Sequence, residues 1–194
     1  MIWRYHGNLS GTHSLLSPSN PAWLNYDESK LSEFYRRFRA KARGTLMHGL
    51  AKTCIDNGIP LGDVNSSDLG IRTLGMYVTD CRDCSMDTEV LLYYSSNAYG
   101  TCDAIRFDEE TRHLLIFDLK TGVTVASFRQ LEIYAAYFCL EYDVDPNTIN
   151  IELRIYQSGD IRVAYPTAQQ IERIMDIVIR FNDVVNEIKK GGGL

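Results

Sequence analysis

Two aspartates and one lysine lie where two neighbouring strands would bring them together. Asp103 falls in a predicted strand at 102–107, and Asp118 and Lys120 come at the end of the next, at 114–119. A short polar connection joins the strands as a hairpin, so both carboxylates can meet at one edge of a sheet. Residues two apart on a strand share a face, which places Lys120 beside Asp118. The sequence therefore predicts two acids and one amine around one point.

That arrangement has a specific chemistry. Two converging carboxylates repel each other, and a hard divalent cation relieves the repulsion; Mg²⁺ favours a few carboxylates together with waters and substrate phosphates. An amine beside the metal can position a water, help to deprotonate it, or stabilise charge on a phosphate. Asp-x-Lys alone is common at solvated strand ends, but the apolar run at 114–117 marks a buried strand, where a charged pair calls for a reason. These are the parts of a metal-dependent phosphodiester hydrolase.

Further elements follow in order along the chain. Gln130 and Tyr134 are four apart and share one face of a predicted helix at about 125–142. Together with Asp103 and with Asp118-Leu119-Lys120-Thr121-Gly122, this set resembles the RecB-like nucleases of the PD-(D/E)XK superfamily, which include phage-type and Cas4-like members. Upstream, Gly44-Thr45-Leu46-Met47-His48 resembles the Gly-Thr-x-x-His element of that family, and the segment 16–19 resembles its Ser-rich start.

The resemblance implies a role for each matching residue. It implies a Mg²⁺ or Mn²⁺ ion held by His48, Asp103, Asp118 and the carbonyl of Leu119. It makes Lys120 the catalytic lysine, with Gln130 and Tyr134 steadying the site or touching the DNA backbone. Glu89, in a predicted strand at 89–94, is either a further acid of the site or a surface residue at a strand end.

Basic residues gather upstream of the candidate site. Between Lys30 and Lys52 there are seven Lys or Arg and one acid, Glu33, in a chain whose net charge is −5. Such a segment could guide phosphates toward a metal, or it could be a solvated helix face. The residues expected to contact DNA are Arg36, Arg37, Arg39, Lys41 and Arg43.

The cysteines point to no further cofactor. Cys81 and Cys84 have the spacing of a metal clip, but a zinc site would need more ligands. Cas4-like nucleases hold an iron–sulfur cluster with three cysteines near the C-terminus, whereas no cysteine follows Cys139 here, so we expect no such cluster. An odd total of five cysteines fits a reducing compartment. We therefore expect a cytoplasmic protein, in the bacterial host cytoplasm if it is phage-encoded.

Length and pattern predict the architecture. The 194 residues suggest a single domain over 1–194. The sequence contains no run of 18 apolar residues, so we expect no membrane span. We expect an N-terminal arm at 1–27, a basic helical segment at 28–57 broken at Gly44, and loops at 58–87. The nuclease core is expected at 88–190. The predicted fold class is α/β, with a central mixed β-sheet of about five strands flanked by helices, as in a restriction-endonuclease-like PD-(D/E)XK core.

Three functions remain open on these residues. The first is an exonuclease that processes DNA ends in recombination or repair, a role typical of phages and mobile elements. The second is an endonuclease of the same fold, acting in restriction or defence. The third is a non-catalytic DNA-binding or interaction module. DNA is the expected partner, beside a recombination or repair protein, and the closing helix at 167–190 either covers the sheet or contacts a further copy of the chain.

Overall fold

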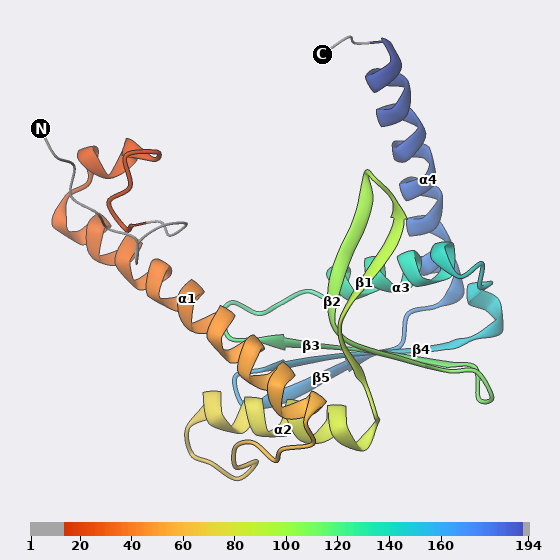
Figure 1. Ribbon diagram of the computed structural model, residues 1–194, viewed down its shortest axis with the longest axis horizontal. Coiled ribbons are helices and arrows are strands. Elements are labelled where there is room, and N and C mark those ends of the chain that lie inside the picture. The colour runs from red at the N-terminus through yellow and green to blue at the C-terminus, as the bar shows by residue number, and fades with distance from the viewer. Residues whose placement is uncertain (1–13, 192–194) are drawn as a thin grey trace, which may run out of the picture. The chain divides into compact units, whose positions relative to one another are not determined.

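The structure is a computed structural model of the chain, and it describes residues 14–191 (Figure 1). The chain divides into two compact units between Arg43 and Gly44. The core predicted at 88–190 lies in the second unit, whereas the basic segment predicted at 28–57 is shared between the two. The single domain over 1–194 stays a prediction. Much of the predicted arm, 1–13, lies outside the described residues.

One long helix forms most of the predicted basic segment. After a 3₁₀ turn, η2 (Pro21–Asn25), helix α1 runs without interruption from Glu28 to Asp56. The prediction that Gly44 breaks this helix is wrong. A glycine inside a helix costs only about 1 kcal/mol relative to alanine, and the burial of Ala51, Cys54 and Ile55 at the end of α1 offsets that cost.

The second unit is built on a mixed five-stranded sheet. Its strands are β1 (Asp87–Ser95), β2 (Ala98–Asp108), β3 (His113–Lys120), β4 (Asn150–Gln157) and β5 (Asp160–Ala164), in that spatial order. All neighbours are antiparallel except β3 and β4, which are parallel. A parallel pair needs a crossover, and α3 (Arg129–Glu141) followed by η3 (Pro146–Thr148) supplies it. The predicted α/β class with a mixed sheet is confirmed.

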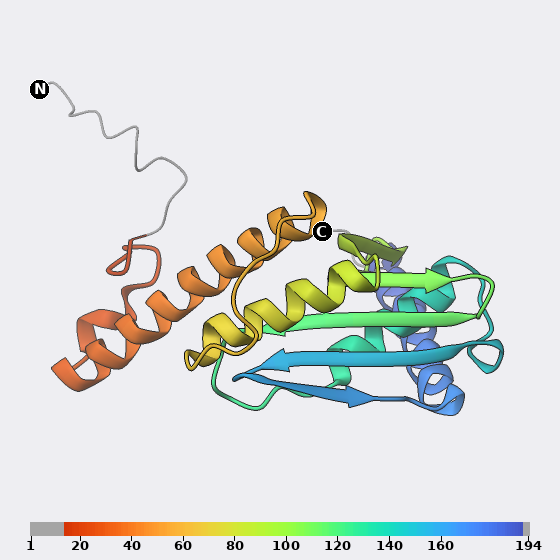
Figure 2. The same ribbon diagram turned by 90° about the horizontal axis from the view of Figure 1, so that it is seen from below.

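Helices cover both faces of this sheet (Figure 1, Figure 2). Helices α3 and α4 (Ala168–Gly191) lie on one face, and α2 (Leu69–Asp83) lies on the other. The alternation along β3 shows why both faces are apolar: Leu114 and Ile116 pack on the α3 side, whereas Phe117 and Leu119 pack on the α2 side. Asp118 and Lys120 continue the series that faces α3. Among the described residues, no helix combines the length and the apolar character needed to cross a bilayer.

Helix α2 corrects the prediction of loops over 58–87. Asp68 caps its first turn by accepting hydrogen bonds from the N–H groups of Gly70 and Ile71. Leu74, Val78 and Cys81 then recur at helical spacing and are buried against the sheet. The glycines and polar residues of the segment hid that periodicity. The helix predicted from about 125 begins only at Arg129.

Candidate metal centre

Three acids stand in a row across adjacent strands. Glu89 lies on β1, Asp103 on β2 and Asp118 on β3. The β1–β2 register places Glu89 opposite Asp103, and the β2–β3 register, continued by one residue, places Asp118 opposite Asp103 from the other side. Like charges directly opposite each other on a sheet are destabilising. A row of three carboxylates therefore calls for a compensating cation.

Helix α1 adds an imidazole to this row. Ligand atoms of His48, Glu89 and Asp103 all lie within 4.8 Å of one another, and His48 Nδ1 is 3.3 Å from Asp103 Oδ2. Imidazole nitrogen and carboxylate oxygen suit divalent ions such as Mn²⁺. The structure thus brings together the predicted ligands His48 and Asp103, with Glu89 as the third member of the group. Asp118 lies outside this set of three.

The backbone of Glu89 is held in the left-handed region. Its φ of +52° is unusual for a residue with a side chain and costs about 1–2 kcal/mol. Such conformations persist where the surroundings enforce them, and they gather at functional sites. In this strand the conformation falls on the residue that completes the cluster with His48 and Asp103.

Asp118 is a buried carboxylate with one oxygen in need of a partner. The residue is 3% exposed. Its Oδ1 accepts a hydrogen bond from Lys120 Nζ at 2.9 Å, while its Oδ2 is buried and has no hydrogen-bond partner among the described residues. Burial, and then repulsion from Asp103, raises the pKa of Asp118, although Lys120 opposes the shift. A divalent cation would partner that oxygen and lower the cost of ionising it, so this residue fits the predicted ligand role.

A chain of hydrogen bonds fixes Lys120. Its ammonium also donates to Gln130 Oε1 at 2.9 Å, Gln130 Nε2 donates to the Tyr134 hydroxyl at 3.2 Å, and that hydroxyl donates to the carbonyl of Thr101 at 2.6 Å. The chain links β3 to α3 and returns to β2. This chain of hydrogen bonds explains why a lysine at 120, a glutamine at 130 and a tyrosine at 134 occur together.

Glycine at position 100 lets the tyrosine come so close. A Cβ on Gly100 would lie 3.0 Å from Tyr134 Cε1, tighter than ordinary van der Waals contact. The sequence pattern alone did not single out Gly100 or the Thr101 carbonyl as part of the site. Gly100 stands two residues before the predicted strand at 102–107, and in the structure it lies inside β2, where a glycine often marks the close approach of another segment.

Asp103 interacts with the backbone of β3 and with the imidazole of His48. The N–H of Leu119 donates to Asp103 Oδ2 at 3.1 Å; the predicted ligand role of the Leu119 carbonyl stays a prediction. The hydrogen bond with Asp103 raises the pKa of His48 above its ordinary value, although burial by itself would lower it. A metal ligand must be the neutral imidazole, so protons would compete with a metal ion for His48.

Gly44 has a positioning role four residues before His48. A Cβ at Gly44 would lie 2.9 Å from Thr121 Oγ1, in the segment that follows β3. The glycine thus lets the helix pass close to the end of β3, where Asp118 and Lys120 lie. This is a physical reason for a glycine one turn before the imidazole, and the helix need not break there.

Other predicted residues lie elsewhere. Arg36, Arg37, Arg39, Lys41 and Arg43 are exposed residues of the first unit, and Arg37 pairs with Glu33; their contact with DNA stays a prediction. Cys81 is buried in the core on the α2 side, which raises the pKa of its thiol and keeps it unreactive.

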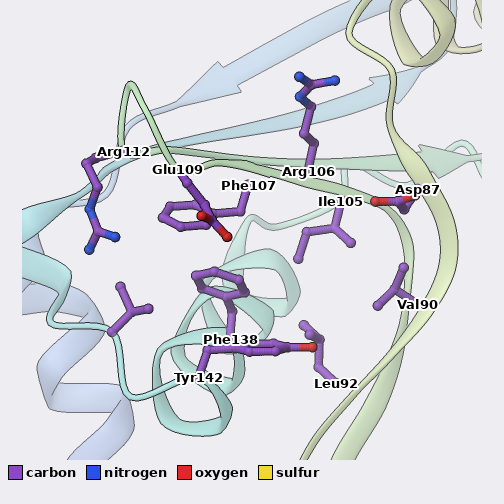
Figure 3. A pocket seen from close by; sticks show the side chains of 11 residues that line it. Asp87, Val90, Leu92, Ile105, Arg106, Phe107, Glu109, Arg112, Phe138 and Tyr142 are labelled. Carbon is purple, nitrogen blue, oxygen red and sulfur yellow. The ribbon is translucent and has the colours of Figure 1, made fainter.

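A separate hollow lies farther along β2 (Figure 3). It has a volume of about 580 Å³, and its aromatic lining comes from Phe107, Phe138 and Tyr142. Arg112 at its edge lies over the Phe107 ring and donates to the Thr148 hydroxyl at 2.8 Å. No member of the acid row lines this hollow, so it adds no group to the candidate metal centre.

Comparison of the chain with models of protein families, with curated proteins and with solved structures gives no match. Function must therefore be inferred from the residues and the geometry of the acid row itself.

Proposed function

We propose that this protein is a Mg²⁺- or Mn²⁺-dependent deoxyribonuclease of the RecB-like, PD-(D/E)XK type. The observation that carries the proposal is the row of Glu89, Asp103 and Asp118 on adjacent strands. His48 lies beside Asp103, and Lys120 lies beside Asp118. Purely structural ion pairing does not account for three adjacent acids, one of them with an unpartnered buried oxygen. A divalent ion accounts for both features.

The donors fall into two groups. His48, Glu89 and Asp103 would hold the ion, and Asp118 Oδ2 offers a further oxygen beside Asp103. The bound ion would supply a more acidic water and neutralise charge on a phosphate. We therefore assign Asp103 on β2 and Asp118 on β3 to binding the metal ion.

Lys120 is the group we assign to the reacting phosphate. Two of the three donors of its ammonium have partners, the carboxylate of Asp118 and the amide of Gln130. Those partners fix the direction of the amine, and the side chain is part-exposed at the site. It can then hold a water or stabilise the developing negative charge. Gln130 and Tyr134 act as positioning residues for Lys120.

The proposed substrate is DNA and the proposed reaction is cleavage from ends. The exposed basic side chains at 36–43 are the proposed backbone contacts. Cleavage from ends would serve recombination or repair.

The direct test uses three labelled DNAs: a linear duplex, a linear single strand and a closed circle. Each is incubated with Mg²⁺ or Mn²⁺ and wild-type protein, with Lys120→Ala, and with wild type in EDTA. We expect degradation of linear DNA that disappears in EDTA and falls by about 10²-fold or more in Lys120→Ala.

Each other outcome has a definite meaning. Cutting of the closed circle replaces the exonuclease by an endonuclease at the same site. If wild type degrades no DNA with either metal while still binding it, the enzyme proposal is overturned and the binding module takes its place. Equal activity of Lys120→Ala and wild type removes the amine from the mechanism.

A further inference from the structure

Helix α4 carries an apolar stripe that its own chain covers only in part. Ile177, Phe181, Val184 and Ile188 are 44%, 55%, 50% and 65% exposed. Their spacings are four, three and four residues, the alternation of a coiled-coil seam. Single exposed apolar residues need no explanation, but a continuous stripe in this register marks an interaction surface.

The fold of the second unit uses a different face of the same helix. Ile171 and Ile174 are buried in the core on the α3 side, and Val178 packs against that core. Farther along, Asn182 accepts hydrogen bonds from Ser95 and Asn97 at the turn between β1 and β2. These contacts hold the helix on its own chain. Ile177 and Phe181 also border a small hollow beside Tyr137 of α3. All four residues of the stripe nevertheless remain 44–65% exposed.

The charges beside the stripe suit a second copy of the helix in the opposite direction. If the four apolar residues pair around the middle of the stripe, Phe181 meets Val184 of the other copy and Ile177 meets its Ile188. The same alignment sets Arg180 beside Glu187 of the other copy, twice by symmetry. Both of these charged side chains are exposed. Within one chain, Arg180 lies over the ring of Phe181 and Glu187 accepts a hydrogen bond from Lys190 at 2.8 Å, so the pairing would exchange these surface contacts for contacts between copies.

A parallel pair lacks this complementarity. In a parallel coiled coil the position of Arg180 faces the position of Val185 across the seam. The guanidinium would then meet an apolar side chain. The observed charges therefore favour the antiparallel, two-fold arrangement, in which one patch serves both copies.

We propose that two copies of this chain associate through their α4 helices, antiparallel, with Arg180 of each copy paired to Glu187 of the other. The inference is independent of the nuclease proposal, because no residue of the candidate metal centre lies on α4. The interface is small, so the dimer forms and dissociates with concentration.

Sedimentation velocity on the whole chain tests the association over a series from about 5 to about 200 µM, where small interfaces associate. Wild type is expected to shift from the mass of one chain to that of two. Phe181→Glu, at an exposed position, is expected to remain a monomer throughout. Circular dichroism checks that the variant is folded, because both proteins should give the same helical signal.

A charge exchange tests the alignment. Arg180→Glu and Glu187→Arg each place like charges together and should weaken the dimer about tenfold, whereas the double variant should restore it. Arg173→Glu reverses a charge on the same helix outside the proposed pair and should leave the dimer unchanged.

A wild-type chain that stays monomeric to the highest concentration overturns the proposal. So does a dimer that Phe181→Glu leaves intact. A dimer that the double charge exchange fails to restore overturns the antiparallel pairing of Arg180 with Glu187.

Discussion

Asp118 is a residue whose burial as a charged group lowers the stability of the fold, and the proposed function gives a reason for that cost. It is an almost fully buried acid whose pKa is raised by burial and by Asp103. A raised pKa in the folded state means that folding favours the protonated form. The stability linked to that proton is present below the pKa of the unfolded state and is lost as pH rises through the folded pKa.

The first prediction follows from that sign. In EDTA, Asp118→Asn should unfold at a higher temperature than wild type at neutral pH, because the amide carries no buried charge. The gain should be on the order of 1 kcal/mol, or about 2–4 °C. It should shrink toward pH ~4, the ordinary range of an aspartate. Thermal unfolding followed by circular dichroism across this pH range makes the measurement.

Nuclease activity of the same variant should be lost. Asp83→Asn, a change of the same kind at an exposed residue at the end of α2, should alter neither property. A variant that is less stable than wild type at neutral pH in EDTA would contradict the account of Asp118.

Between elements, the decisive contact is the approach of α1 to the segment after β3. Gly44→Ala would put a Cβ 2.9 Å from Thr121 Oγ1 and push the helix that carries His48 away from Asp103. We therefore expect a several-fold loss of Mn²⁺ affinity, measured by calorimetry. Removing the obstacle in Gly44→Ala/Thr121→Ala should recover most of that loss, since the two sites are directly coupled.

Gly49 provides the matched control on the same helix. A Cβ at Gly49 meets nothing within 4 Å. Gly49→Ala should therefore stabilise the protein by about 0.5–1 kcal/mol through helix propensity alone, with unchanged Mn²⁺ affinity. If Gly44→Ala behaves like Gly49→Ala, the positioning role of Gly44 is wrong.

The sequence predicted helices and strands well wherever the spacing of apolar residues was regular. The strands around Asp103 and Asp118 were predicted to within a few residues, because alternating and continuous apolar runs bounded by turns are strong signals. Helix α2 was missed, because Gly70 and Gly75 imitate a loop. The left-handed backbone of Glu89 has no local signal, since glutamate does not favour it. The sequence left Glu89 as either a further acid of the site or a surface residue, and its position opposite Asp103 decides for the site.

Across the whole molecule, metal binding and stability should be linked. An ion bound only by the folded protein stabilises it by about 2.7 kcal/mol at a hundred times its dissociation constant. Wild type should therefore unfold several degrees higher in excess Mn²⁺ than in EDTA.

Glu89→Gln/Asp103→Asn should lose that shift. In EDTA the double variant should be at least as stable as wild type, because it removes like charges from the row. Glu109→Gln, an exposed acid in the turn between β2 and β3, should keep the full shift. A full Mn²⁺ shift in the double variant would place the ion elsewhere.

The α/β fold class followed from the sequence, while helix α2 and the division at Gly44 did not. Local periodicity reports what each element buries, but a boundary between compact units depends on contacts that no local pattern encodes. The acid row is the intermediate case. Each of its members could be named from the sequence. The register of β1 against β2 was needed to show that Glu89 completes the cluster with His48.

The most direct test of the central claim is the rate of Mn²⁺-dependent cleavage of an end-labelled linear duplex by wild type, Asp103→Asn and Glu109→Gln. Asp103 touches His48, stands between the other two acids and accepts from the backbone of β3. The account predicts cleavage by wild type and Glu109→Gln, and a loss of about 10³-fold or more in Asp103→Asn. Cleavage by Asp103→Asn at the wild-type rate would contradict it.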